Sequence, residues 1–243
     1  MFKGVRQSKI TQKIIEQIRT AILQGKLKPG DKLPSEKEMV ELFQVSKQTL
    51  RESMRALEYL GMIDVRKGIG GGAFIVEVDI EVTKQSLANY LYFKHMTIQD
   101  LSEFRKLIEP YAAHKAAQQI SPAELEKLKA LNDCARENLR QGDAQAARRD
   151  EFDFHRYLAE LTHNPLIVLI LDFAEGMLDD FKKIVQPDIA FFKDVLASHD
   201  RIYEAISLGD AQNAHDEMYD HVVAVGDHLA KLKEGFDLRK LYT

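Results

Sequence analysis

One glutamate and three histidines in the second half of the chain have the types and spacing of a metal site. Glu151 precedes His155 by four residues, which places both side chains on the same face of a helix. His199 opens the segment HDRIYEAI, and His221 lies within DEMYDHVV. Neutral imidazoles and one carboxylate that converge from three helices can bind a divalent transition metal. The alternative is that Glu151 and His155 form a solvated pair on a helix surface and that the other two histidines are unrelated to it. Spacing alone does not decide between this alternative and a metal site.

Arg105, in the segment LSEFRKLIEPYAAHKAA, also has the chemistry of a binding residue. A planar guanidinium can hold a carboxylate through two hydrogen bonds. Its spacing predicts another role as well, because Glu109 follows four residues later and such a pair is typical of a solvated helix face. The other histidines fit no part of this set, and we interpret them as structural or exposed: His95, His114, His163, His215 and His228.

Residues 25–60 have the pattern of two short helices joined by a tight turn. Ser35 and Glu38 form a capping box at the start of the first helix, and Ser46 caps the second after a turn at Gln44–Val45. Apolar residues of the second helix recur with helical spacing, as Leu50, Met54, Leu57 and Leu60. This pattern predicts a helix-turn-helix.

Polar and cationic side chains crowd the first turn of that second helix, namely Lys47, Gln48, Thr49 and Arg51. Cations at this end oppose the helix dipole, so a purely structural design favours acids there. A recognition helix presents this end to base edges in the major groove. We therefore predict DNA contacts from these four residues, from the cap Ser46 and from nearby Lys37. Two ordinary amphipathic helices with a solvated basic end are the alternative.

A glycine-rich hairpin follows the two helices. Residues 63–66 and 73–76 have the composition of short strands, and four of the six residues between them are glycine. Such a tip permits positive φ and a close backbone approach, which suits a wing that lays Lys67 and Gly68 along a minor groove. A nucleotide-binding glycine loop needs a helix after it, whereas a strand follows here.

Charge is divided unevenly along the chain. Residues 1–76 hold 14 Lys/Arg and eight Asp/Glu, a net charge of +6, whereas residues 77–243 hold 20 and 30, a net charge of −10. This asymmetry is expected when only one domain faces nucleic acid. For a chain of 243 residues we predict a DNA-binding domain at 1–76, a linker at 77–82 and a second domain at 83–243.

The second domain has helical periodicity and almost no strand alternation. Turn signals such as Ser121-Pro122, Asn164-Pro165 and Gly209-Asp210, with Ser121 and Asp210 as caps, separate the helices. They predict helices near 83–94, 97–119, 122–141, 143–163, 165–186, 188–208 and 210–232. The predicted fold class is mainly α: a winged helix-turn-helix with a small β-hairpin, followed by an all-helical bundle of six or seven helices that builds a pocket from inward side chains.

Several features of the sequence bear on its cellular context. Cys134 is the only cysteine, so an intrachain disulfide is excluded, and a lone cysteine on a helix is more often a small core residue than a redox sensor. The first residues lack a hydrophobic signal core, and the longest aliphatic run, 166–171, is far shorter than the roughly 20 residues that span a bilayer. We expect a soluble, cytoplasmic protein.

The first 76 residues resemble the winged helix of the GntR family of bacterial transcription regulators. The resemblance covers residues 8–76 without an insertion, and its hallmarks stand here as Ile22, Gly25, Leu27, Pro29-Gly30-Asp31, Leu33-Pro34-Ser35-Glu36, Val45-Ser46, Thr49-Leu50-Arg51-Glu52, Leu57, Gly61 and the hairpin from Gly68 to Val76. The family commonly has arginine where this chain has Lys37 and Lys47. The resemblance therefore implies that Arg51 is the surer reader of guanine.

The second domain resembles the FCD ligand-binding domain of the FadR-type GntR subfamily. The matching motifs are Glu151 before Phe154-His155 and Asn164-Pro165, then His199 before Ala205-Ile206 and Gly209-Asp210, and finally His221. In many members an acid and three histidines at these places hold Zn²⁺, Ni²⁺ or a similar ion, and an arginine at the place of Arg105 pairs with an effector carboxylate. This chain has Glu151 where the subfamily usually has aspartate, which changes the reach of the carboxylate.

The leading hypothesis is a ligand-responsive bacterial transcription regulator. It predicts that a small carboxylate effector binds beside an ion held by Glu151, His155, His199 and His221, with Arg105 at its other end, and alters operator binding. It also predicts a homodimer on double-stranded operator DNA with an inverted repeat, and no enzyme activity. The alternatives are an architectural DNA-binding protein with a ligand-free helical domain and a metallohydrolase, for which the sequence offers no HExxH-like motif.

Overall fold

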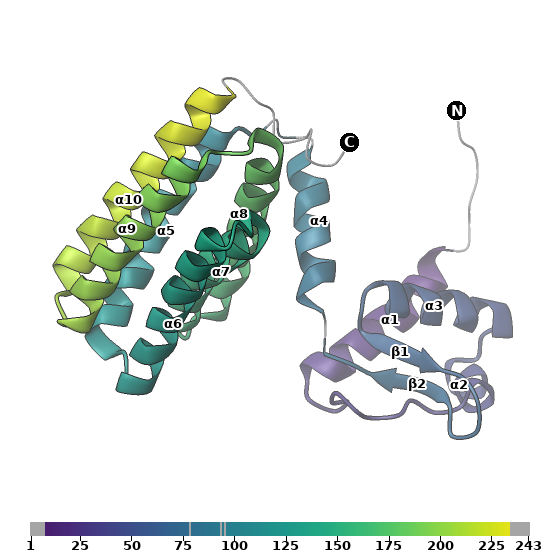
Figure 1. Ribbon diagram of the computed structural model, residues 1–243. Coiled ribbons are helices and arrows are strands. Elements are labelled where there is room, and N and C mark those ends of the chain that lie inside the picture. The colour runs from purple at the N-terminus through teal and green to yellow at the C-terminus, as the bar shows by residue number, and fades with distance from the viewer. Residues whose placement is uncertain (1–7, 78, 93, 95, 234–243) are drawn as a thin grey trace. The chain divides into compact units, whose positions relative to one another are not determined.

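The computed structural model describes residues 8–77, 79–92, 94 and 96–233, which form ten helices and one two-stranded sheet (Figure 1). The chain divides into two compact units between Ser86 and Leu87. Helix α4, Ile80–Tyr92, begins within the predicted linker at 77–82 and runs across this division. The predicted mainly α fold is confirmed, with a small antiparallel hairpin after the helix-turn-helix.

Three helices and a hairpin make up the first unit. In chain order they are α1 (Ser8–Leu23), α2 (Glu36–Phe43), α3 (Lys47–Tyr59), β1 (Ile63–Arg66) and β2 (Gly72–Ile75). Helix α3 packs against α1, α2 and β1. Its apolar stripe is buried in a core that includes Ile14, Ile18, Leu50, Leu57, Ile63 and Ile75. The polar start of α3 is thereby left at the surface.

Serine caps start both helices of the helix-turn-helix, as the sequence predicts. Ser35 Oγ accepts a hydrogen bond from the Glu38 backbone N–H at 3.3 Å, and the Glu38 carboxylate accepts one from the Ser35 N–H at 2.7 Å. Gln44 ends α2 with a left-handed φ of 53°. Ser46 Oγ then accepts a hydrogen bond from the Thr49 N–H at 3.1 Å. These bonds satisfy free helix-end donors and fix where α3 starts.

The hairpin is an antiparallel pair in which Ile63 faces Ile75 and Arg66 faces Gly72. Strand β1 has the predicted bounds, whereas β2 runs one residue earlier than predicted. A Cβ atom on Gly71 would lie 2.4 Å from the Arg66 carbonyl oxygen, so only glycine fits this close backbone approach. The tight return of the chain therefore requires glycine at position 71.

The rest of the chain is helical, as predicted. The helices are α5 (Ile98–Gln119), α6 (Pro122–Arg140), α7 (Ala144–Glu160), α8 (Pro165–Val185), α9 (Ile189–Ser207) and α10 (Ala211–Leu232), and Figure 1 shows them gathered in a bundle. Helix α10 packs along α5 and α9, and α7 packs between α6 and α8. The predicted caps Ser121 and Asp210 are confirmed, since each side chain accepts a backbone hydrogen bond from its helix.

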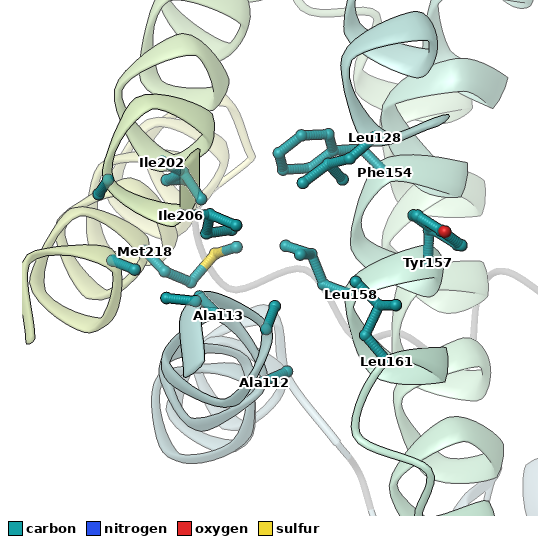
Figure 2. Close-up of a cluster of buried hydrophobic side chains, with 14 of the residues drawn as sticks. Ala112, Ala113, Leu128, Phe154, Tyr157, Leu158, Leu161, Ile202, Ile206 and Met218 are labelled. Carbon is teal, nitrogen blue, oxygen red and sulfur yellow. The ribbon is translucent and has the colours of Figure 1, made fainter. Parts of the chain in front are cut away.

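Two apolar clusters fill the bundle. One joins Leu101 of α5 to residues of α8, α9 and α10 such as Phe181, Val195 and Val225. The other joins the later part of α5 to α6, α7, α9 and α10. Figure 2 shows this second cluster, in which Leu158 points from α7 toward Ile206. Along α5 and α9 the clusters are separated by polar residues, and these polar residues form the candidate site.

Two further observations concern the expected cellular context. Cys134 is exposed, so the expectation that it is a small core residue is wrong; it lies on the outer face of α6. Among the described residues, no helix is both long enough and apolar enough to cross a membrane.

Candidate metal centre and DNA-binding surface

Three buried histidines meet where the two apolar clusters adjoin. His155 comes from α7, His199 from α9 and His221 from α10, and each offers a ring nitrogen within 4.8 Å of those offered by the others. The Nε2 atoms of His155 and His199 lie 3.1 Å apart. The Phe154 ring stacks on His199 with centroids 4.1 Å apart, which fixes one side of this imidazole. The structure therefore brings the three predicted histidines together.

Several ring nitrogens of this cluster have no hydrogen-bond partner. Nδ1 of His199 and both nitrogens of His221 are buried and unpaired. A buried polar atom left without a partner costs roughly 1–3 kcal/mol, so such atoms indicate a missing ligand. Burial, followed by the charges of neighbouring side chains, lowers the pKa of His199 and of His221 well below its usual value. Both imidazoles are thus neutral, as metal ligands must be, and the cluster fits a divalent ion.

Glu109 of α5 orients one of the histidines. Its Oε2 atom lies 2.7 Å from Nδ1 of His155, on the far side of the ring from the Nε2 that faces His199. A carboxylate behind a histidine in this way fixes the tautomer and frees the other nitrogen for a metal. Burial acts against a charged His155, but Glu109 and Glu175 outweigh it, so the pKa of His155 is raised.

Arg105 is buried in the bundle, so the alternative interpretation of a solvated ion pair with Glu109 is wrong. It is 1% exposed, and its Nε atom lies 2.5 Å from Glu109 Oε1 and 2.6 Å from Glu175 Oε1. The predicted pairing with Glu109 is present, and α8 supplies a second carboxylate, Glu175. Only Nη1 of the guanidinium is buried without a hydrogen-bond partner. Arg105 therefore keeps one donor group for an additional anion.

The pKa values of the two carboxyl groups beside Arg105 are shifted in opposite directions. Burial raises the pKa of Glu175. Burial also favours the neutral form of Glu109, but the interactions with Arg105 and His155 outweigh it, and the pKa of Glu109 lies well below its usual range. Glu109 therefore keeps its negative charge to a lower pH than Glu175 does.

Glu151 is the one predicted ligand that the structure does not place in the histidine cluster. Its Oε1 atom pairs with the Lys182 ammonium of α8, and both side chains are buried, 3% and 4% exposed. Its other oxygen, Oε2, is buried and has no hydrogen-bond partner. Among the described residues, two groups of possible ligand atoms lie within 4.8 Å of one another: His155 with His199 and His221, and His155 with Glu109 and Glu175. Neither group includes Glu151.

Sequence reasoning did not find Glu175 and Lys182. They lie seven residues apart on α8, and this spacing of two turns places them on one helix face, which is the available signal. The segment around Lys182 is rich in charge, and charged side chains are seldom fully buried, so the pattern indicates a solvated face. Only the packing of α8 against α7 and α5 places these two residues inward.

A hollow between α9 and α10 reaches one of the three histidines. Its volume is about 380 Å³, and His221 is among the residues that line it. The other lining residues are Phe191, Asp194, Val195, Ser198, Ala224, Val225, Asp227, His228 and Lys231. Volumes of this order accommodate small organic ligands.

The predicted DNA-contacting residues gather at the start of α3. Lys47, Gln48 and Arg51 are exposed there. Glu36 of α2 pairs with Lys47 Nζ and with Arg51 Nε, each at 3.0 Å. Exposed ion pairs of this kind contribute about 0–1 kcal/mol, so they leave both cations available to DNA. Thr49 differs from the others, because it is buried and its hydroxyl lies 2.8 Å from Ser46 Oγ.

The remaining predicted contacts lie on α2 and the wing. Lys37 is exposed on α2, and Lys67 and Gly68 are exposed at the hairpin tip, where Gly68 has a φ of 93°. A groove of about 840 Å³ lies among α2, α3 and the hairpin, and both Arg51 and Lys67 line it. Thr49 and Ser46 hold the turn, and the exposed cations form the surface that can meet phosphates and bases.

Comparison with known proteins agrees with this arrangement. Residues 10–73 match the profile described as "Bacterial regulatory proteins, gntR family", and residues 100–224 match the "FCD domain". The HTH-type transcriptional regulator LutR of Bacillus subtilis is 30% identical over 215 residues, which cover 86% of this chain and 96% of LutR. The chain belongs to the GntR family.

Other relatives of this GntR-family chain are regulators as well. The galactonate operon transcriptional repressor of Escherichia coli is 27% identical over 232 residues, covering 92% of this chain and 97% of the repressor. The solved structure of Streptococcus agalactiae GntR has a TM-score of 0.68 and 26% identity, covering 90% of this chain and 99% of that one. The predicted resemblance is confirmed: the protein is a DNA-binding transcription regulator with an FCD domain, and its relatives are regulators, not enzymes.

The histidines outside the cluster have the structural or surface positions that the sequence suggests. His228 packs its ring 4.7 Å from that of Phe191, and His114 Nδ1 lies 3.0 Å from the Ala211 carbonyl oxygen. His215 is exposed. His95 lies outside the described residues.

Proposed function

We propose that this GntR-family regulator responds to a small carboxylate that binds in its helical unit beside a divalent ion. His155, His199 and His221 hold the ion, Zn²⁺ or Ni²⁺ by ligand type. When bound, the ion supplies a Lewis acid for the carboxylate oxygens of the effector. Arg105 offers its unpaired Nη1 to the same ligand. Effector binding then changes the affinity of the protein for operator DNA.

The observation that carries the proposal is the set of unpaired nitrogens on two buried, neutral imidazoles. A helical domain with a purely architectural role gains nothing from such groups, because apolar residues of the same size are better accommodated in a core. The same argument applies to Arg105, which is among the largest fully buried side chains. A layer with this much buried polarity is typical of a ligand site.

The charged side chains that are buried around the three histidines favour an anionic effector. When the three imidazoles are neutral and all three buried carboxyl groups are ionised, Glu109, Glu151 and Glu175 carry three negative charges against the two positive charges of Arg105 and Lys182, which leaves one negative charge. A divalent ion changes this to one positive charge, and a monocarboxylate then restores neutrality. Buried charges are stable only when they are compensated, so ion and effector favour each other's binding. The name of one relative, a galactonate operon repressor, agrees with a carboxylate effector.

On DNA we propose a twofold-symmetric homodimer that reads an inverted repeat. One recognition helix reads only a few base pairs, so selection among genomic sites needs two half-sites. Arg51 reads bases from the start of α3, whereas Lys37, Lys47 and Lys67 contribute mainly phosphate contacts. Helix α4, which carries the chain from one unit to the other, transmits the effector signal by changing the placement of the two winged helices.

A thermal-shift screen of carboxylic acids tests the proposal directly. The full-length protein is loaded with Zn²⁺ or Ni²⁺ and scanned against hydroxy acids, sugar acids and dicarboxylates, with and without a chelator. We expect at least one acid to raise the melting temperature only in the metal-loaded protein, and the same acid to change operator affinity. If metal-loaded and chelated protein give the same response to every acid, an ion-dependent effector site is ruled out.

A further inference from the structure

Glu151 and Lys182 form a buried ion pair in the helical bundle. The two residues come from α7 and α8, are 31 positions apart and are almost fully buried. Breaking a buried ion pair by removing one partner typically costs about 3–5 kcal/mol, because the other charge is left uncompensated. If Glu151 left Lys182 to coordinate an ion, the buried ammonium would lose its counter-ion, at the same cost in free energy.

Lys182 is also close to the histidine cluster. Its Nζ atom lies 5.7 Å from the centre of the Phe191 ring, and Phe191 lines the same hollow as His221. Lys182 thus stands beside the place where an ion and its ligand are expected, with Glu151 on its other side.

We propose that Glu151 is the counter-ion of Lys182 and not a metal ligand, so that this regulator holds its ion by His155, His199 and His221 alone. The inference rests on the proposed function and departs from the four-residue ligand set that the sequence suggests. Three neutral imidazoles leave both charges of the ion uncompensated by its protein ligands. Divalent transition ions take four or more ligands, so at least one position is left for an oxygen from outside the protein.

This arrangement assigns Lys182 a specific role. By holding Glu151, the ammonium keeps an internal carboxylate from taking the coordination position that the effector carboxylate needs. Lys182 is a positioning residue, because it acts on the ion through Glu151. Without Glu151 as a ligand, the protein binds the ion less tightly, but the ion attracts an external anion more strongly.

Cobalt titration of the full-length protein tests this ligand set, because Co²⁺ absorption reports changes of ligand and of coordination number. The deciding variant is Glu151→Gln/Lys182→Met, which removes both charges of the pair and leaves neither uncompensated. We expect its Co²⁺ affinity and spectrum to match the wild type within about threefold, whereas His221→Ala loses at least tenfold in affinity. Circular dichroism establishes that each variant is folded.

Lys182→Met alone gives the complementary result. With its partner removed, Glu151 is free to coordinate, so Co²⁺ should bind at least tenfold more tightly, with a changed spectrum and a weaker spectral response to added acetate. Lys183→Met is the matched control, because this neighbouring lysine is half exposed and pairs with Asp179 and Asp180. We expect it to behave as the wild type.

The outcomes separate this inference from the proposed function. If the double variant loses Co²⁺ as His221→Ala does while the wild type binds it, Glu151 is a ligand and the inference is overturned, with the proposed function intact. No tightening in Lys182→Met overturns the restraining role of Lys182. A wild-type protein that binds no Co²⁺ overturns both the ligand set and the ion in the proposed function.

Discussion

His155 and His199 are 44 positions apart in the chain, yet their Nε2 atoms lie 3.1 Å from each other in the middle of the bundle. Each atom is held there by a different neighbour. Glu109 fixes His155 through its Nδ1 atom, and Phe154 stacks on the His199 ring. Two nitrogens oriented toward one point from two helices are preorganised for a common ligand.

The first prediction concerns the metal content of the purified protein. His199→Ala removes one of the three imidazoles, so we expect the bound metal to fall at least tenfold from a content near one ion per chain in the wild type. Mass spectrometry of the elements in protein purified without a histidine tag measures this. His215→Ala is the matched control, because His215 is an exposed residue paired with Asp216. Equal metal content in wild type and His199→Ala contradicts the assignment.

The second prediction concerns the buried layer around Arg105. Arg105→Gln leaves Glu109 and Glu175 buried without their shared cation, and such uncompensated charges typically cost about 3–5 kcal/mol. We expect the free energy of unfolding in urea to fall by that amount. Arg140→Gln is the control: Arg140 is 70% exposed on α6 and pairs with Glu137 at 3.5 Å, so its loss should cost about 0–1 kcal/mol. Similar losses in the two variants would show that the layer is hydrated in solution.

Much of this fold could be predicted from the sequence, because its helix ends are strongly marked. Pairs such as Ser121-Pro122 and Asn164-Pro165 supply a cap and a residue suited to the first turn, and the observed helices start at those places. The start of α4 was less clear. Asp79 accepts a hydrogen bond from the Glu81 N–H at 2.9 Å, but the sequence there lacks a capping box, and the helix starts at Ile80 instead of near residue 83.

The candidate site was only partly predictable, for a physical reason. The chain has 38 acidic and 34 basic residues, and among the described residues most of them are partly or fully exposed. Histidines with a recognisable motif stand out from this background, whereas Glu175 and Lys182 do not. Whether a charged residue points inward depends on the rotation of its helix, which is set by apolar contacts far from it in sequence. The partner of Glu151 is therefore visible only in the structure.

The third prediction concerns DNA recognition by α3. Arg51→Ala should weaken binding to the specific operator by roughly 1–3 kcal/mol and relax the preference at the base pair that Arg51 contacts. Lys47→Ala should instead weaken binding to all sequences and reduce the slope of log affinity against log salt by about one. Fluorescence anisotropy at several salt concentrations measures both. Lys129→Ala, an exposed lysine of α6, is the control that should change neither. Unchanged operator affinity in Arg51→Ala rules out its role.

The fourth prediction concerns the oligomeric state. At micromolar concentration we expect light scattering to give twice the chain mass of 27.8 kDa for the free protein, and the mass of two chains plus one operator for the complex. Operators with one half-site scrambled should lose most of their specific affinity, because only one recognition helix then reads its bases. A monomer in both conditions, with full affinity for a single half-site, contradicts the proposed inverted-repeat recognition.

The fifth prediction concerns the coupling between the two units. An effector shifts DNA affinity only by the difference between its affinities for the DNA-competent and DNA-incompetent states. Because the proposed effector needs the ion, a chelator should abolish the effector response while leaving DNA binding by effector-free protein within about threefold. Restoring Zn²⁺ or Ni²⁺ should restore the response, which separates metal loss from damage to the protein.

Two variants make this last experiment decisive. Operator affinity is measured against the concentration of the acid selected by thermal shift, for wild type, His221→Ala and the control His215→Ala. His221 lines the hollow between α9 and α10. We therefore expect the change of operator affinity with acid to vanish in His221→Ala and to persist in His215→Ala. Arg105→Ala is unsuitable as the sole test. Without the guanidinium, the buried carboxylates of Glu109 and Glu175 lose their counter-ion and destabilise the bundle. If His221→Ala responds to the acid as the wild type does, the effector acts at another site.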